Sequence, residues 1–159
     1  MASTTEARVA VITGGSSGIG LNAARALRDR GLKVYELSRR AENAEPGVTH
    51  LQADVTDEAQ VDAAVAEVLR REGRIDILIN NAGGGTSMPI LEMTDEAYFK
   101  DINTDLLGLF KCLREFGKVM VKQGYGRIIN IASILGLVGE NGVPVAGYQS
   151  AKGGVVNLT

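Results

Sequence analysis

Short apolar stretches alternate with longer amphipathic segments along most of the chain. Five stretches rich in Val, Ile and Leu read as strands, at residues 8–13, 33–38, 48–53, 74–80 and 126–132. Between them, apolar residues recur at intervals of three and four, the period of a helix that packs on one face. This alternation predicts parallel β-α units, and therefore an α/β protein with a doubly wound parallel sheet (Rossmann fold) between two helical layers.

The helical segments can be placed in more detail. The first is expected to end at Gly31 and to bury a face made of Ile19, Ala23, Ala26 and Leu27. A second is expected over residues 57–71, with Thr56 as N-cap, Gly73 beyond its end, and an inward face of Val61, Val65 and Val68. Residues 94–123 are expected to hold a short helix and then a longer one, and a last helix begins near residue 147.

The composition and charge of the chain exclude several classes of protein. The net charge is −2 and no basic run exceeds two residues, so neither a nucleic-acid footprint nor a polybasic membrane patch is expected. The start of the chain lacks the pattern of a secretory signal, and no apolar run approaches the roughly 20 residues that span a membrane. Cys112 is the only cysteine, which fits a buried helical thiol. We expect a cytoplasmic protein of one domain over residues 1–159, without a metal site, whose partner is a small molecule.

A glycine-rich turn follows the first predicted strand. The segment TGGSSGIG, residues 13–20, has glycines at 14, 18 and 20 where a strand passes into a helix. The N–H groups at a helix start suit a pyrophosphate, and glycine allows the backbone to approach it. Tight packing of the helix on the strand would require glycine even without a ligand, so the turn alone is weak evidence.

The end of the second predicted strand indicates which dinucleotide would bind. It reads Ser38, Arg39, Arg40, and a hydroxyl with a guanidinium suits the 2′-phosphate of NADP(H). Glu36 is the kind of residue that binds the ribose hydroxyls of NAD, but strand pleating places it roughly 7 Å deeper than Ser38. We therefore expect NADP rather than NAD. The alternative is that both arginines are ordinary surface charges.

Several motifs together resemble the short-chain dehydrogenase/reductase family. They are TGGSSGIG, Asp54 with Val55, NNAG at 80–83, Ser133 after the fifth strand, and YQSAK at 148–152, in the order that the family has them. The resemblance covers nearly all of residues 6–159. It implies cofactor contacts by the glycine-rich turn and Ser38–Arg39, adenine contacts by Asp54 and Val55, and ribose contacts by Asn81, Ala82 and Gly83. Within the turn, the implied contacts are Gly14, Ser16, Ser17, Gly18, Ile19 and Gly20.

The catalytic residues implied by the resemblance include a tyrosine and a lysine one helical turn apart. Tyr148 and Lys152 are separated by four residues and so share one face of a helix. A phenol whose pKa is about 10 exchanges protons poorly at neutral pH, and a nearby ammonium stabilises the phenolate. By the resemblance, Tyr148 transfers the proton, Lys152 assists it and binds the nicotinamide ribose, and Ser133 holds the substrate oxygen. Without the surrounding motifs, Tyr148 and Lys152 would be read as an ordinary pair of surface residues.

Two features depart from the family pattern. The interval from Ser133 to Tyr148 is about two residues longer than is usual, which is expected to reshape the substrate mouth. Asp105 stands where the family usually has an asparagine that supports a water chain to the lysine, and Asn103 would face elsewhere. A carboxylate there would pair with the Lys152 ammonium. Some sugar-acid dehydrogenases resembling gluconate 5-dehydrogenase also have Asp there, so Asp105 is expected to mark a subgroup.

Three functions follow from these observations. The first is an NADP(H)-dependent alcohol dehydrogenase or carbonyl reductase, acting on a sugar acid or a 3-oxoacyl thioester. The second is an NAD-dependent polyol or sugar-acid dehydrogenase that uses Glu36. The third is a non-catalytic NADPH-binding module, because family members continue beyond the last helix through C-terminal strands and a substrate-covering segment. Without those C-terminal strands and that covering segment, the fifth strand would form an exposed edge of the sheet. The chain alone would then be a poor catalyst. Family likeness places a homo-oligomer interface, in a dimer or tetramer, on residues 94–123 and 147 onward.

Overall fold

The computed structural model describes residues 7–43, 45–139, 142 and 144–159. The expectation about the start of the chain falls mainly on residues 1–6, and part of the longer interval before Tyr148 falls on 140, 141 and 143. Both therefore lie outside the described residues.

Five parallel strands form one sheet, and β1 (Val9–Thr13) lies at its centre. The spatial order is β3-β2-β1-β4-β5, where the other strands are β2 (Lys33–Ser38), β3 (Val48–Gln52), β4 (Ile77–Asn80) and β5 (Arg127–Asn130). The chain adds β2 and β3 on one side of β1 and then returns to add β4 and β5 on the other. The strand order thus reverses between β1 and β4, and a ligand crevice is expected at the carboxyl ends of these strands.

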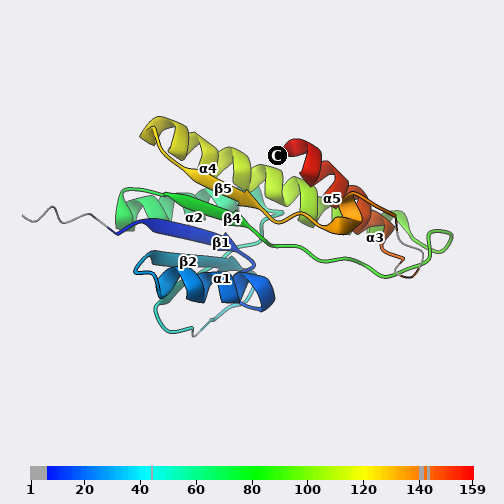
Figure 1. Ribbon diagram of the computed structural model, residues 1–159, viewed down its shortest axis with the longest axis horizontal. Coiled ribbons are helices and arrows are strands. Elements are labelled where there is room, and N and C mark those ends of the chain that lie inside the picture. Colours follow the sequence, from blue (N-terminus) through cyan, green and yellow to red (C-terminus); the bar gives the residue numbers. More distant parts are fainter. Residues whose placement is uncertain (1–6, 44, 140–141, 143) are drawn as a thin grey trace, which may run out of the picture.

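Helices cover both faces of the sheet, which confirms the doubly wound Rossmann fold (Figure 1). Helix α1 packs on one face, and α2 and α4 pack together on the other. The helical elements are α1 (Gly18–Arg28), α2 (Glu58–Glu72), α3 (Asp95–Ile102), η1 (Asn103–Gly108), α4 (Leu109–Gln123), η2 (Ile134–Gly136) and α5 (Ala146–Leu158). Helix α5 lies against α3, η1 and η2.

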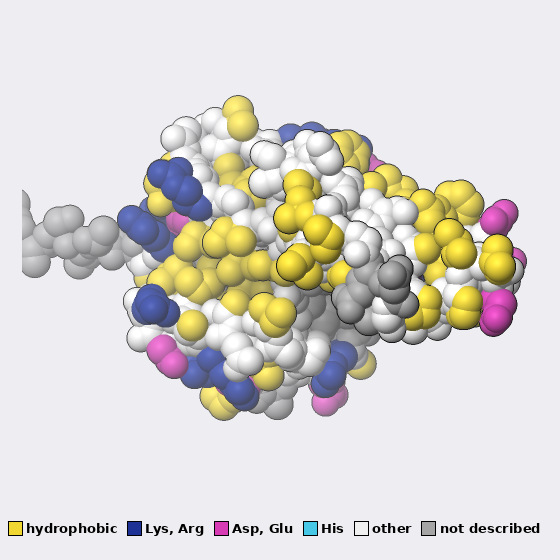
Figure 2. All heavy atoms as spheres, turned by 45° about the vertical axis from the view of Figure 1, so that its right-hand side comes forward, with side chains coloured by type: hydrophobic (Ala, Val, Ile, Leu, Met, Phe, Trp, Pro, Cys, Tyr) yellow, Lys and Arg dark blue, Asp and Glu magenta, His cyan; other side chains and the backbone are white. Residues whose placement is uncertain are grey.

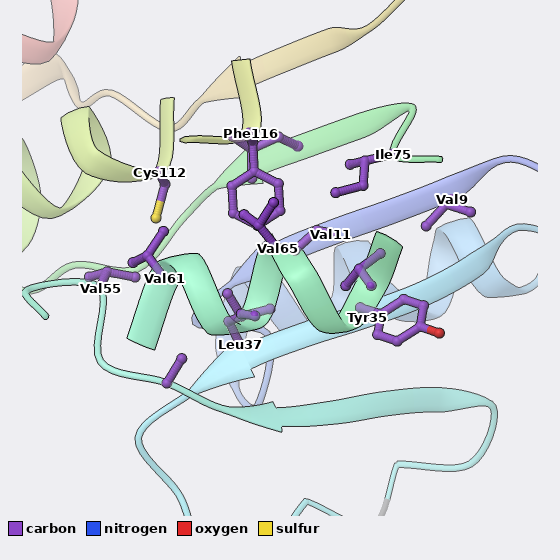
Figure 3. Packing of buried hydrophobic residues seen from close by; sticks show 14 of the residues in the cluster. Val9, Val11, Tyr35, Leu37, Val55, Val61, Val65, Ile75, Cys112 and Phe116 are labelled. Carbon is purple, nitrogen blue, oxygen red and sulfur yellow. The ribbon is translucent and has the colours of Figure 1, made fainter. Parts of the chain in front are cut away.

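The strand β1 supplies both halves of the core because its side chains alternate between the faces. Val9 and Val11 join a cluster with Phe116 and Cys112 of α4 (Figure 3). Ile12 instead packs with Ala24 of α1 on the opposite face. Cys112 is fully buried, as expected, and desolvation raises the pKa of its thiol to about 12.

The packed face of α1 differs from the predicted one. Gly20 and Ala24 are buried and Ala23 and Leu27 are partly buried, whereas Ile19 and Ala26 are exposed. The prediction was wrong for Ile19 and Ala26 because small residues let the helix lie close to the sheet, which shifts the buried face toward them. Ile19 instead lies beside the cavity described below.

The other helices confirm most of their predicted features. Val61, Val65 and Val68 of α2 are buried, and Gly73 ends this helix with a φ of 69°. The N-cap is Asp57 rather than Thr56, because the Asp57 carboxylate accepts hydrogen bonds from Ala59 N and Gln60 N.

Residues 95–123 hold a short helix, α3, and then a longer one, α4, as predicted, and the two are joined into one continuous helical path. The π-helical segment η1 joins α3 to α4, and the residues at both junctions keep right-handed helical backbone angles. Such segments accommodate an extra residue within a helix and often lie at functional sites.

The strand β5 lies at one edge of the sheet, as expected. Its Ile128 packs against the core that α4 covers, whereas Ile129, which points to the other face, is half exposed. Hydrophobic side chains gather in several places on the face shown in Figure 2. Several large hydrophobic side chains on the path from α3 to α4 are exposed among the described residues, including Phe99, Leu107, Phe110 and Val121.

The close approach of α1 to the glycine-rich turn can be tested by adding one methyl group. A Cβ at Gly20 would lie 2.5 Å from Asn81 Nδ2 and would also collide with the Gly14 carbonyl, so Gly20→Ala should lower the free energy of unfolding by about 1–3 kcal/mol. Gly117→Ala is the matched control, since nothing lies within 4 Å of its Cβ position in α4, and it should raise stability by about 0.5–1 kcal/mol. Urea unfolding measures both. Equal changes in the free energy of unfolding for the two variants would show that α1 does not lie tightly against the glycine-rich turn.

Candidate functional site

A cavity of about 1040 Å³ opens at the carboxyl ends of the strands, where the strand order reverses. Its wall combines the glycine-rich turn, the ends of β2 and β3, the segment after β4, the start of the long helical path and the first turns of α5. Every residue predicted to bind the cofactor lines it except Gly20, which is buried behind the turn. The predicted cofactor-binding residues that line it are Gly14, Ser16, Ser17, Gly18, Ile19, Ser38, Arg39, Asp54, Val55, Asn81, Ala82, Gly83, Tyr148 and Lys152.

The glycine-rich turn is held by hydrogen bonds to the neighbouring strand ends. Gly14 adopts a φ of 66°, and its N–H donates to the Leu37 carbonyl at 2.7 Å. The Asn81 amide donates to the carbonyls of Thr13 and Gly14 at 3.1 and 3.2 Å. Thr13 Oγ1 in turn accepts from the N–H groups of Asn81 and Ala82, both at 3.0 Å. The Asn81 side chain therefore stabilises the conformation of the turn.

The start of α1 lies at the cavity, and the first N–H groups of a helix have no partners within the helix. The N-cap Ser17 makes no side-chain capping hydrogen bond, and Ser16, Ser17 and Gly18 all line the cavity. Unpaired N–H groups and the helix dipole make this position favourable for an anion.

The end of β2 places basic residues, and no acid, beside the cavity. Ser38, Arg39 and Arg40 line it, whereas Glu36 is fully buried and does not. This agrees with the prediction that Glu36 lies too deep for a ribose contact. Asp54, at the end of β3, lines the cavity while its carboxylate accepts hydrogen bonds from Thr56 N and Thr56 Oγ1 at 2.9 and 2.8 Å.

At the other end of the cavity, Tyr148 and Lys152 share one face of α5, as predicted. The Lys152 ammonium lies 5.5 Å from the centre of the Tyr148 ring. It donates to the Ile131 carbonyl at 2.8 Å and lies 3.4 Å from Asp105 Oδ1. The lysine side chain is 4% exposed, so these oxygens provide its charge with partners inside the protein.

Asp105 joins the lysine to the segment after β4. Its two oxygens accept from the Gly84 N–H at 3.2 and 3.1 Å, and Gly83 has no room for a side chain beside them. Burial raises the pKa of the Asp105 carboxyl above its ordinary value, while the Gly84 N–H and the Lys152 ammonium act in the opposite direction. Asn103 is exposed, as predicted.

A second buried carboxylate was not predicted. Asp101 lines the cavity, and its oxygens accept from Thr86 N at 2.8 Å and Thr86 Oγ1 at 3.0 Å. Its position four residues before Asp105 is the sequence signal that could have revealed it. Met88 N then donates to the Pro144 carbonyl at 2.7 Å, which links the segment after β4 to the residues before α5.

Ser133 is the one predicted catalytic residue that does not line the cavity. Its Oγ accepts a hydrogen bond from Leu135 N at 3.2 Å and thereby caps the short η2 turn. Ile131, two residues earlier, does line the cavity.

The described residues contain no cluster of three or more His, Cys, Asp or Glu side chains that could hold a metal ion. No helix among them is both long enough and apolar enough to cross a membrane.

Comparisons with known proteins find one family. A model of the short chain dehydrogenase family matches residues 8–159. The chain is 37% identical over 164 residues to a 3-oxoacyl-[acyl-carrier-protein] reductase of Synechocystis sp., covering 96% of this chain and 66% of that protein. It is 39% identical over 160 residues to a 2-dehydro-3-deoxy-L-rhamnonate dehydrogenase (NAD(+)) of Sphingomonas sp., covering 96% and 63%.

Solved structures agree in fold. A variant of actinorhodin polyketide ketoreductase with NADPH superposes with a TM-score of 0.90 at 34% identity, covering 96% of this chain and 62% of that one. The chain thus spans less than two thirds of the length of the relatives that it matches, 66% and 63% in the two curated ones.

Removal of the Asp105 carboxylate should destabilise the fold through the lysine. Asp105→Ala leaves the buried Lys152 ammonium without its counter-charge, so we expect the free energy of unfolding in urea to fall by about 3 kcal/mol or more. Adding Lys152→Met should restore part of this loss, because the unpaired charge is removed.

The matched control for this loss is Glu67→Ala, which breaks ion pairs on the exposed surface of α2 and should change stability little. Additive losses in the Asp105 and Lys152 double variant would contradict the coupling.

Proposed function

Because the chain belongs to the short-chain dehydrogenase family, we propose that it is the cofactor-binding and proton-transferring part of an NADP(H)-dependent oxidoreductase. The reaction would interconvert a secondary alcohol and a ketone. The observation that carries the proposal is one cavity with Arg39 at one end and the Tyr148–Lys152 pair at the other.

The glycines around the cavity allow main chain to form its walls, which suits the binding of a dinucleotide. Gly14, in a left-handed backbone conformation, lets the glycine-rich turn lie against the segment after β4, where a Cβ would come within 3.0 Å of the Ala82 Cα. Gly85 lies against Tyr148, where a Cβ would come within 3.0 Å of the tyrosine Cβ. Between these points, the start of α1 offers N–H groups for the phosphates.

The residues that would hold NADP(H) follow from their places along this cavity. Arg39 and Ser38 would bind the 2′-phosphate, and Asp54 and Val55 would contact the adenine. The start of α1 would bind the pyrophosphate, and Lys152 would reach the nicotinamide ribose. The bound nicotinamide supplies the hydride, which is chemistry that side chains do not provide.

The side chains of α5 would move the proton. In the direction of reduction, the Tyr148 hydroxyl donates its proton to the carbonyl oxygen as that oxygen gains negative charge. The Lys152 ammonium favours the resulting phenolate, and it is held in place by the Ile131 carbonyl and Asp105. Oxidation of an alcohol reverses these roles.

Ser133 would assist at the same oxygen. Its hydroxyl accepts from Leu135 N and still has its own hydrogen to donate. This role rests on the family resemblance together with the position of Ser133 just after β5.

A 3-oxoacyl thioester is the substrate class that the Synechocystis relative supports. A second candidate is an NAD-dependent sugar-acid dehydrogenase, favoured by the Sphingomonas relative. Arg39 and Arg40 at the cavity favour an NADP(H)-dependent enzyme over an NAD-dependent one, because NAD has no 2′-phosphate for them to bind. By family likeness, subunit contacts in an oligomer would form on α3, η1, α4 and α5.

Tyr148→Phe tests the proton-transfer role. This variant removes only the hydroxyl, so NADPH affinity should stay within about twofold while ketone reduction falls by a factor of about 10² or more. Isothermal titration and NADPH oxidation in the full-length protein measure the two quantities. Tyr125→Phe, at the far end of β5, is the control and should keep wild-type turnover. A protein that binds NADPH but reduces no ketone in a broad panel would instead be a binding module.

Arg39→Ala tests the choice of cofactor. Loss of a charge-assisted contact to phosphate should raise the Kd for NADPH by a factor of about 10 or more and leave the Kd for NADH within about twofold. Arg30→Ala, on the exposed surface after α1, is the control. Tighter binding of NADH than of NADPH by the unaltered protein would favour the NAD-dependent alternative.

A further inference from the structure

A buried acid lies beside the predicted 2′-phosphate position and has a histidine partner that no sequence motif revealed. Glu36 of β2 is fully buried, and its register partner on β3 is His50. The Oε1 atom of Glu36 accepts from Asn43 Nδ2 at 3.0 Å and Ser38 Oγ at 3.3 Å, and it contacts His50 Nδ1. Its Oε2 atom has no hydrogen-bond partner among the described residues.

The two contacts of His50 fix the number of protons on this pair. His50 Nδ1 faces the Glu36 carboxylate, and His50 Nε2 lies 3.0 Å from the Arg40 carbonyl oxygen. A carbonyl oxygen only accepts, and a neutral imidazole has a single N–H. Both hydrogen bonds form only if the pair carries an additional proton, which makes His50 and Glu36 together neutral instead of anionic.

The same contacts position the arginine segment. His50 and Gln52 are two residues apart on β3, and Gln52 Nε2 donates to the Arg39 carbonyl at 3.3 Å. The β3 side chains thus hold the main-chain oxygens of both arginines that line the cavity. The Glu36 side chain in turn lies against Gly15 of the glycine-rich turn, where a Cβ would come within 2.5 Å of the Glu36 Cβ.

We propose that His50 is a positioning and specificity-determining residue for the 2′-phosphate of the cofactor. It neutralises Glu36 and fixes the Arg40 main chain, so that the end of β2 accepts a dianionic phosphate. Without it, the buried carboxylate would repel the phosphate of NADPH but not the hydroxyl of NADH. The inference rests on the proposed function, since it assumes that the 2′-phosphate binds at Ser38 and Arg39.

The test compares NADPH and NADH binding in three variants. His50→Gln should raise the Kd for NADPH about tenfold and the Kd for NADH by less than about twofold, measured by isothermal titration. Adding Glu36→Gln removes the uncompensated charge and should restore the Kd for NADPH to near the wild-type value. Thr49→Ser, at the neighbouring position on β3, is the matched control and should change neither.

The outcomes separate this inference from the proposed function. Equal losses for both cofactors would show that His50 is merely structural, and a failure of the double variant to recover would overturn the charge argument. If His50→Gln does not fold, Glu36→Gln alone decides, because a drop in NADPH affinity relative to NADH would contradict repulsion by Glu36. A wild-type protein that prefers NADH would refute the proposed cofactor whatever the variants show.

Discussion

A buried ammonium group determines how four parts of this protein meet. The Lys152 charge, held away from water on α5, requires oxygen atoms, and it finds them on the residue after β5 and on η1. Asp105, the η1 partner, also binds the main chain after β4 through Gly84. The need to compensate one charge therefore brings together segments that are up to about 70 residues apart in the sequence.

The cavity depends on close backbone approach as much as on its polar groups. Gly20 lets α1 lie against Gly14 and Asn81, and Gly83 leaves room for Asp105. The reversal of strand order between β1 and β4 opens the crevice, and the glycines allow its walls to be formed by main chain. Side chains then distinguish its two ends, with arginines beside β2 and a tyrosine and lysine on α5.

The sequence predicted the strands and many of the residues that line the cavity, because the relevant signals are local. Alternating apolar runs identified the strands, and the spacing of Tyr148 and Lys152 placed them on one face of α5. The errors came from tertiary packing: Ile19 reads as a core residue, yet the small residues beside it let the helix turn a different face to the sheet.

Long-range partners could not be predicted in the same way. Asp101 binds the loop after β4, and His50 meets Glu36 across two strands. The first contact depends on how α3 lies against that loop and the second on the register of β2 and β3, and neither leaves a clear pattern of hydrophobic residues.

The π-helical segment also has a consequence for how the chain tolerates changes in length. One residue turns an α-helix by about 100°. Deleting Asn103 or Thr104 would remove the extra residue that the π-helical segment accommodates, so α3 and α4 could still form one regular helix, but Asp105 would turn away from Lys152 and Gly84. Insertions and deletions here would thus be more harmful than most substitutions on the exposed side of the same helix, although the hydrophobic pattern of α4 would remain unchanged.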